Sequence, residues 1–219
     1  MNVRVKICGM TRLEDALHAE AQGAHALGFI FYPPSPRAAD PARVAEFSAK
    51  LHPFTVKVGV FVDETPEHIN AIVERCRLDR IQLHGQEPFE MLKQLTRPAY
   101  RAFKLRDAGD LARVKEEPDA VAMLDTFDPA LVGGTGRPFN WEWARELALE
   151  KRIILAGGLS PDNVAAAIAA ARPAAVDASS SLESEPGRKD PAKVEAFFKA
   201  LRGLTTQTHS GSDNDVIAV

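Results

Sequence analysis

Val3-Arg4-Val5-Lys6-Ile7-Cys8-Gly9-Met10-Thr11 (residues 3–11) contains the unit from which the fold of this chain can be predicted. Apolar residues at positions 3, 5 and 7 alternate with Arg4, Lys6 and Cys8, which indicates a strand with one apolar face. Gly9 is predicted to end the strand, and Thr11 to cap a helix that begins near residue 12. A thiol is therefore expected at the carboxyl end of a strand, on the same face as Lys6.

The same unit of strand, polar turn and helix recurs along the chain. Predicted strands cover residues 3–8, 26–31, 56–62, 80–84, 100–105, 120–125, 152–156 and 174–178. The helices between and after them are predicted to begin near residues 13, 41, 66, 88, 110, 141, 161 and 191. Strict alternation of strands and helices predicts a parallel sheet with right-handed crossovers.

Two α/β architectures satisfy this alternation: an open doubly wound sheet and a closed (β/α)₈ TIM barrel. Three predicted strands carry polar residues on the face opposite their apolar one: Lys6 and Cys8, Gln82 and His84, Asp177 and Ser179. An open sheet covered by helices on both sides would need both faces apolar, whereas the upper layer of a barrel tolerates polar side chains. We therefore predict a single barrel domain over residues 1–204, followed by a disordered tail at 205–219 that is rich in Thr, Ser, Asp and Asn.

Composition narrows the classes of function. The 219 residues are 45% hydrophobic and carry a formal net charge of -3, so one sizeable core is possible and no basic surface for nucleic acid is expected. The two cysteines, Cys8 and Cys76, are too few for a disulfide framework, and their spacing is not that of a zinc site. Cys76 is expected to be a packing residue. No signal peptide or membrane span is predicted. We expect a cytoplasmic protein.

Two loops late in the chain favour a phosphate site. Gly157 and Gly158 follow the seventh predicted strand, and Ser180 and Ser181 follow the eighth. In TIM barrels the loops after these two strands commonly bind phosphate through backbone N–H groups and a helix N-terminus.

Three further residues are expected at the same mouth. Arg37 follows a loop stiffened by prolines, and its guanidinium is suited to binding a carboxylate or a phosphate with two parallel hydrogen bonds. Asp125 ends the sixth predicted strand, and His84 ends the fourth, where packing, lining of the mouth and catalysis all remain open. The glycine-rich loop 127–138 begins beside Asp125 and is predicted to be a lid.

Taken together, the motifs resemble the phosphoribosylanthranilate isomerase family of tryptophan biosynthesis. The matching segments, in order, are Lys6-Ile7-Cys8-Gly9, Gly28-Phe29-Ile30-Phe31, Ser35-Pro36-Arg37, Val60-Phe61-Val62, Gln82-Leu83-His84-Gly85, Leu124-Asp125, Gly133-Gly134-Thr135-Gly136, Leu155-Ala156-Gly157-Gly158-Leu159, Asn163-Val164 and Pro186-Gly187-Arg188-Lys189-Asp190. The resemblance implies a TIM barrel with no metal and no organic cofactor. It also implies a phosphosugar substrate, no nucleic-acid or membrane partner, and a monomer or homodimer.

The reaction that the resemblance implies is an Amadori rearrangement of N-(5-phosphoribosyl)anthranilate to 1-(2-carboxyphenylamino)-1-deoxyribulose 5-phosphate. It assigns Asp125 as the general acid that opens the ribose ring and Cys8 as the general base that removes the C2′ proton. A thiol acts as a base only when ionised, and the charge of Lys6 could favour that form. Arg37 would bind the anthranilate carboxylate, Asp177 the sugar hydroxyls, and His84 would contact the substrate. Ser181 stands where the family usually has glycine, which predicts backbone strain if that position needs a positive φ.

Two alternatives remain at this point. An aminoaldose isomerase of histidine biosynthesis has a similar barrel and reaction, but it is expected to carry an aspartate base where Cys8 stands. A phosphosugar-binding barrel without catalysis is also possible, although Cys8 and Asp125 argue against it.

Overall fold

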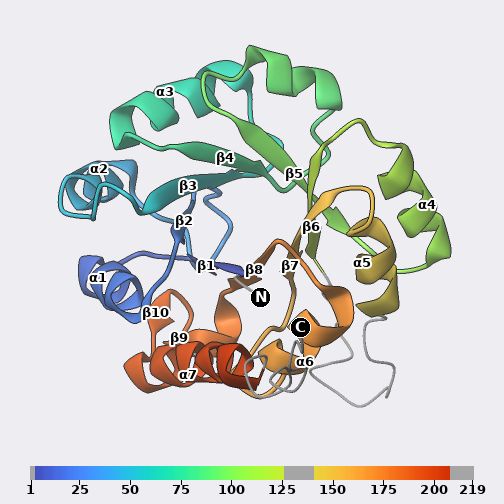
Figure 1. Ribbon diagram of the computed structural model, residues 1–219. Helices are drawn as coiled ribbons and strands as arrows, with labels where there is room; N and C mark the ends of the chain where they lie inside the picture. Colours follow the sequence, from blue (N-terminus) through green and yellow to red (C-terminus); the bar gives the residue numbers. More distant parts are fainter. Residues whose placement is uncertain (1–2, 126–140, 208–219) are drawn as a thin grey trace, which may run out of the picture.

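A computed structural model describes residues 3–125 and 141–207 of the chain. Within these residues eight parallel strands close into a barrel in chain order, with β1 paired to both β2 and β8 (Figure 1). The strands are β1 (Arg4–Cys8), β2 (Ala26–Ile30), β3 (Val56–Phe61), β4 (Arg80–Leu83), β5 (Ala99–Lys104), β6 (Val121–Asp125), β7 (Arg152–Ala156) and β8 (Ala175–Ala178). The closed barrel is confirmed, and the open sheet is excluded.

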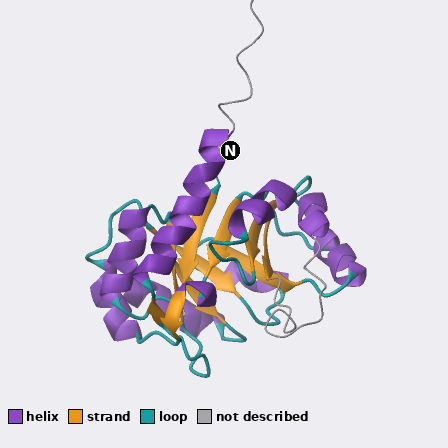
Figure 2. Cartoon of the chain, turned by 90° about the horizontal axis from the view of Figure 1, so that it is seen from below, coloured by secondary structure: helices purple, strands orange, loops and turns teal. Residues whose placement is uncertain are grey.

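Helices surround the barrel and cover its strands, as Figure 2 shows from below. They are α1 (Leu13–Gln22), α2 (Pro41–Ser48), α3 (Pro66–Cys76), the 3₁₀ helix η1 (Phe89–Gln94), α4 (Ala108–Glu116), α5 (Trp141–Leu147), α6 (Val164–Ala171), the 3₁₀ helix η3 (Ser180–Leu182) and α7 (Pro191–Gln207). None of the described helices is long and apolar enough to cross a membrane. The predicted lid at 127–138 and residues 208–219 of the predicted tail lie outside the described residues.

Two layers of buried side chains stabilise this arrangement. The larger layer lies between strands and helices and includes Ile7, Leu27 and Phe197, while Val58, Tyr100, Met123 and Ala156 fill the barrel interior. Burial of an aliphatic side chain stabilises a fold by roughly 1.5–3 kcal/mol, so the larger layer dominates. The interior also holds Lys6, Gln82 and Asp177, which are at most 6% exposed. Polar residues therefore face inward on β1, β4 and β8, as predicted.

The cap of α1 and the start of α6 differ from the sequence prediction. Thr11 does not cap α1, because the N-cap residue of this helix is Arg12, which makes no side-chain cap hydrogen bond. The Thr11 hydroxyl instead donates to the Gly187 carbonyl at 2.5 Å. Helix α6 begins at Val164 rather than near residue 161. The reason is local, because the Asn163 side chain accepts from Ser160 N at 2.8 Å and donates to the Gly158 carbonyl at 3.0 Å, which holds the preceding residues in a turn.

A short antiparallel hairpin between β8 and α7 was not predicted. It consists of β9 (Glu183–Glu185) and β10 (Arg188–Lys189), joined through Pro186 and Gly187. Gly187 has φ +83°, a left-handed conformation that favours glycine. The hairpin lies beside β1 and α1 (Figure 1), and the hydrogen bond from Thr11 fixes its turn to the start of the chain.

Candidate active site

A cavity of about 580 Å³ opens at the carboxyl ends of the barrel strands. All nine residues predicted for the site line it, from six different strand ends or loops: Cys8, Arg37, His84, Asp125, Gly157, Gly158, Asp177, Ser180 and Ser181. Parallel strands bring their carboxyl ends to one face of a barrel, which explains why residues so distant in sequence meet here. Among the described residues, no group of three or more His, Cys, Asp or Glu side chains could hold a metal ion.

Cys8 lies at the end of β1, above a buried ion pair. Its side chain is enclosed, with the residue 6% exposed, and Gly28 on β2 leaves room for it, because a Cβ there would lie 2.6 Å from Cys8 Sγ. Burial raises the pKa of the Cys8 thiol above its ordinary value, and the Lys6 ammonium acts in the opposite direction. Lys6 thus favours the ionised thiol, as predicted, but burial has the larger effect on the pKa of Cys8.

The ion pair itself joins the first and last barrel strands. Lys6 Nζ lies 2.7 Å from Asp177 Oδ2, and both side chains are buried. Burial alone would lower the pKa of Lys6, but the Asp177 carboxylate raises it above its ordinary value. The other carboxylate oxygen, Asp177 Oδ1, is buried without a hydrogen-bond partner among the described residues. Because buried polar atoms are normally paired, this oxygen is available to accept from a ligand hydroxyl.

Asp125 is connected to the barrel interior by a chain of hydrogen bonds. The Tyr100 hydroxyl donates to Gln82 Oε1 at 3.1 Å, and the Gln82 amide nitrogen lies 2.8 Å from His84 Nδ1. In this arrangement Nδ1 must accept, so a neutral His84 carries its proton on Nε2. His84 Nε2 then donates to Asp125 Oδ2, at 3.2 Å. His84 is therefore a partner of Asp125 as well as a lining residue.

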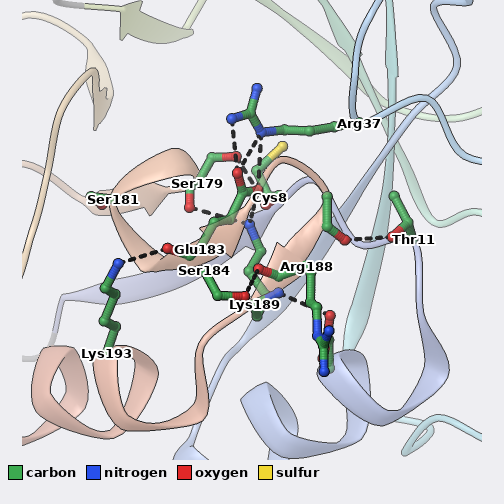
Figure 3. A network of polar contacts seen from close by, with 12 residues as sticks. Cys8, Thr11, Arg37, Ser179, Ser181, Glu183, Ser184, Arg188, Lys189 and Lys193 are labelled. Carbon is green, nitrogen blue, oxygen red and sulfur yellow. Dashed lines mark hydrogen bonds and ion pairs between the residues drawn. The ribbon is translucent and has the colours of Figure 1, made fainter.

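Arg37 reaches the cavity from the loop after β2 but has a protein partner there. Its Nε and Nη2 donate to the carboxylate of Glu183 at 2.8–2.9 Å (Figure 3). Lys189 Nζ donates to the same carboxylate at 2.8 Å and to the Ser179 carbonyl at 3.2 Å. Burial alone would raise the pKa of Glu183, but these two cations bring it below its ordinary value. Burial lowers the pKa of Lys189, and Glu183 opposes that shift.

The two predicted phosphate loops lie side by side and are connected. Gly157 and Gly158 adopt φ values of +85° and +62°, which other residues rarely adopt. The Ser181 hydroxyl donates to the Leu159 carbonyl, which joins the loop after β8 to the loop after β7. Among the described residues, the non-glycine positions with positive φ are Asp63, Arg77 and Arg172. Ser181 is not one of them, so the strain considered from its sequence position is absent.

Sequence reasoning missed several residues of this site. Glu183 and Lys189 lie in strands of three and two residues, which are too short for periodicity to indicate which way a side chain points. Lys104 lines the cavity from the end of β5, and the only signal for it was its position at the end of a predicted strand. Lys189 lies within a segment that matched the family pattern, which could have drawn attention to it.

Comparisons with known proteins agree on one family. The family model described as N-(5′-phosphoribosyl)anthranilate (PRA) isomerase matches residues 5–200. The N-(5′-phosphoribosyl)anthranilate isomerase of Geotalea uraniireducens is 48% identical over 201 residues, covering 92% of this chain and 99% of the relative.

Solved structures give the same result. A phosphoribosyl anthranilate isomerase in complex with reduced 1-(o-carboxyphenylamino)-1-deoxyribulose 5-phosphate has a TM-score of 0.84 and 39% identity, covering 93% of this chain and all of that one. Monomers generated from the dimeric phosphoribosylanthranilate isomerase of Thermotoga maritima have a TM-score of 0.83 and 37% identity, with coverage of 93% and 100%.

Proposed function

Because this chain belongs to the N-(5′-phosphoribosyl)anthranilate isomerase family and catalyses the Amadori rearrangement of that family in tryptophan biosynthesis, we propose that Cys8 and Asp125 are its general base and general acid. An enzyme of this family is an aldose–ketose isomerase. Its substrate and product contain the same atoms and electrons, because one carbon of the sugar is oxidised as its neighbour is reduced. Because the chain belongs to this family, it is neither the aminoaldose isomerase of histidine biosynthesis nor a phosphosugar-binding barrel without catalysis.

The acid step begins the reaction. Asp125 protonates the ribose ring oxygen, the bond from C1′ to that oxygen breaks, and the anthranilate nitrogen forms a Schiff base with C1′. For this step the carboxyl group must hold a proton and face the ring oxygen. Its place at the end of β6 on the cavity wall supports that role, and His84 Nε2, 3.2 Å from Oδ2, orients the carboxyl group.

The base step follows at C2′ of the sugar. The Cys8 thiolate removes the C2′ proton, and the electron pair of that C–H bond forms the C1′–C2′ double bond of an enolamine while the electrons of the C1′–N double bond return to nitrogen. Protonation at C1′ and loss of the proton from the C2′ hydroxyl then give the ketose. A raised pKa makes the thiolate scarcer at neutral pH but also a stronger base once formed. The Lys6 ammonium lies near the sulfur and stabilises its anion.

Three groups of contacts would hold the substrate. Arg37 binds the anthranilate carboxylate, and the unpaired Oδ1 of Asp177 accepts from a sugar hydroxyl. Backbone N–H groups around Gly157, Gly158, Ser180 and Ser181 bind the phosphate, and the bond between Ser181 and Leu159 keeps the two loops together. The observation that carries the proposal is that acid, base, cation and phosphate loops all line one cavity.

The remaining expectations concern the whole protein. We propose one catalytic barrel domain, a cytoplasmic location and a small phosphosugar as the only ligand the reaction requires. A monomer and a homodimer are both compatible with the family, in which the T. maritima relative is described as dimeric.

Two substitutions test the assignment of acid and base. Cys8→Ser and Asp125→Asn should each lower kcat by about 10²- to 10⁴-fold, because each removes one proton-transfer group. Cys76→Ser is the matched control, since Cys76 is buried in α3 away from the cavity. Turnover is followed by loss of the fluorescent anthranilate substrate, with circular dichroism to verify folding. Near-normal kcat in either folded site variant would refute its assigned role.

A further inference from the structure

Figure 3 shows a compact network in which the β9–β10 hairpin lies against Arg37. Glu183, at the start of β9, is buried, with its side chain 4% exposed, and it receives hydrogen bonds from both Arg37 and Lys189. Glu183 pairs with an arginine that lines the cavity, and burial of its charge is costly unless it is paired. Here two cations from different elements share one anion.

The geometry of the pairing leaves part of Arg37 unused. A guanidinium has two forked edges, one formed by Nε and Nη2 and the other by Nη1 and Nη2. Glu183 occupies the first edge, with Nε at 2.9 Å from both carboxylate oxygens and Nη2 at 2.8 Å from Oε2. No described residue accepts a hydrogen bond from Nη1. The second edge thus remains for a ligand, and Arg37 lines the cavity with its side chain 22% exposed.

We propose that Glu183 is a positioning residue that holds Arg37 by one edge so that the other edge receives the carboxylate of the substrate. The inference rests on the proposed function, in which Arg37 binds the anthranilate carboxylate. Both carboxylates are bound at the same time, because Glu183 uses one N–H from Nε and one from Nη2, and three N–H groups remain.

Two neighbouring contacts fix the position of Glu183, and a third restrains Arg37. Lys189 Nζ holds its side chain, and Lys193 Nζ donates to its backbone carbonyl at 2.7 Å. On the opposite side, the stem of Arg37 passes closely over Gly9, since a Cβ at Gly9 would lie 2.9 Å from Arg37 Cδ. The guanidinium is therefore restrained from the hairpin, the barrel wall and α7, which limits the rotamers that a long flexible side chain would otherwise sample.

The experiment compares the binding of two product analogues that differ only in the carboxylate. One is reduced 1-(2-carboxyphenylamino)-1-deoxyribulose 5-phosphate, and the other is its counterpart with an unsubstituted phenyl ring. Glu183→Gln should raise the dissociation constant of the carboxylate-bearing analogue by roughly 10- to 100-fold, because Arg37 is no longer held in place. The dissociation constant of the second analogue should change less than about threefold.

A general loss of structure would not produce this selectivity, since it would weaken the binding of both analogues. Glu185→Gln is the matched control: Glu185 lies on the same strand, but its side chain is 63% exposed and, within the part of the chain that the structure describes, pairs only with Arg188, at 3.4 Å. It should leave both dissociation constants unchanged. Should Glu183→Gln not fold, Glu183→Asp keeps the charge but shortens the reach, and it should show the same selective loss to a smaller degree.

Arg37→Ala separates the two levels of the inference. If Arg37→Ala selectively weakens binding of the carboxylate-bearing analogue and Glu183→Gln does not, the proposed role of Glu183 is wrong while the role of Arg37 stands. If Arg37→Ala has no selective effect either, the proposed binding role of Arg37 fails, and the inference fails with it. Equal weakening of both analogues by folded Glu183→Gln would also overturn the positioning role.

Discussion

At the scale of single residues, the most informative side chain is the thiol of Cys8. Its position could be predicted because a strand alternates its faces and Gly9 ends that strand, so Cys8 had to share a face with Lys6. The pKa of Cys8 could not be predicted, since it depends on how tightly β2 and β8 enclose the sulfur. Burial raises that pKa, so the free enzyme should hold this thiol mostly protonated at neutral pH.

The ionisation of Cys8 can be measured by alkylation, because only the thiolate reacts. The rate of iodoacetamide modification of Cys8 should rise about tenfold per pH unit from pH 7 to 9 and continue to rise above pH 9. Turnover is a less direct measure, since the proposed mechanism also requires a proton on Asp125. Peptide mapping by mass spectrometry identifies the modified residue. Cys76 is an internal control, because it is fully buried and its pKa is raised to about 11. A rate that is constant between pH 7 and 9 would contradict the prediction.

Gly28 shows how a residue without a side chain contributes to the site. A Cβ at this position would lie 2.6 Å from Cys8 Sγ and 3.0 Å from Lys6 Cε, so Gly28→Ala should displace the thiol. We expect kcat to fall by roughly 100-fold, since a shift of about 1 Å in a reacting group has that effect, while the fold is retained. Gly203→Ala is the control, because a Cβ there meets nothing within 4 Å. Unchanged kcat in Gly28→Ala would mean that the thiol adapts without loss.

At the scale of elements, strands were easier to predict than the segments between them. Strand β7 has the predicted bounds, because a run of apolar residues between polar turns has few alternatives. The hairpin β9–β10 was missed, since its five strand residues include four charged ones and carry no apolar alternation. This hairpin supplies Glu183 and Lys189, so the missed element and the missed site residues have the same cause.

Gly187 controls the turn of this hairpin. Its φ of +83° favours glycine, and its carbonyl accepts from the Thr11 hydroxyl at 2.5 Å. Gly187→Ala should lower the free energy of unfolding by about 1–2 kcal/mol through strain in the left-handed region. It should also raise KM, because Glu183 and Lys189 flank the turn. Urea unfolding and steady-state kinetics measure the two effects, and Gly203→Ala is again the control. A normal free energy of unfolding in Gly187→Ala would show that the turn changes type at no cost.

At the scale of the whole molecule, the barrel closes between β1 and β8, where Lys6 pairs with Asp177. Closure was predictable from polar residues on inward faces, but the pairing itself required the register of the two strands. Lys6→Met should lower the free energy of unfolding at pH 8 by about 3–5 kcal/mol, because it leaves a buried carboxylate unpaired. The double variant Lys6→Met/Asp177→Leu should recover most of that loss.

The pH dependence of the Lys6→Met variant has a defined sign. Burial raises the pKa of Asp177, and the Lys6 ammonium that opposes this shift is removed by the substitution. A folded-state pKa above the unfolded value favours the folded state at low pH, and this advantage is lost as the pH rises. The stability deficit relative to the unmodified protein should therefore be smaller at pH 5 than at pH 8, as measured by urea unfolding. An equal deficit at both values would show that Asp177 does not take up the proton.

The seam between β1 and β8 also has a consequence for the protein while it is being made. Cys8 is translated 171 residues before Ser179, whose hydroxyl donates to the Cys8 carbonyl. Asp177 and the hairpin that holds Arg37 are equally late. During translation of the barrel, the proposed base Cys8, and soon afterwards Arg37, are therefore present without the groups that complete their surroundings. The catalytic pocket matures only when the last eighth of the barrel has been translated and has folded back onto the first.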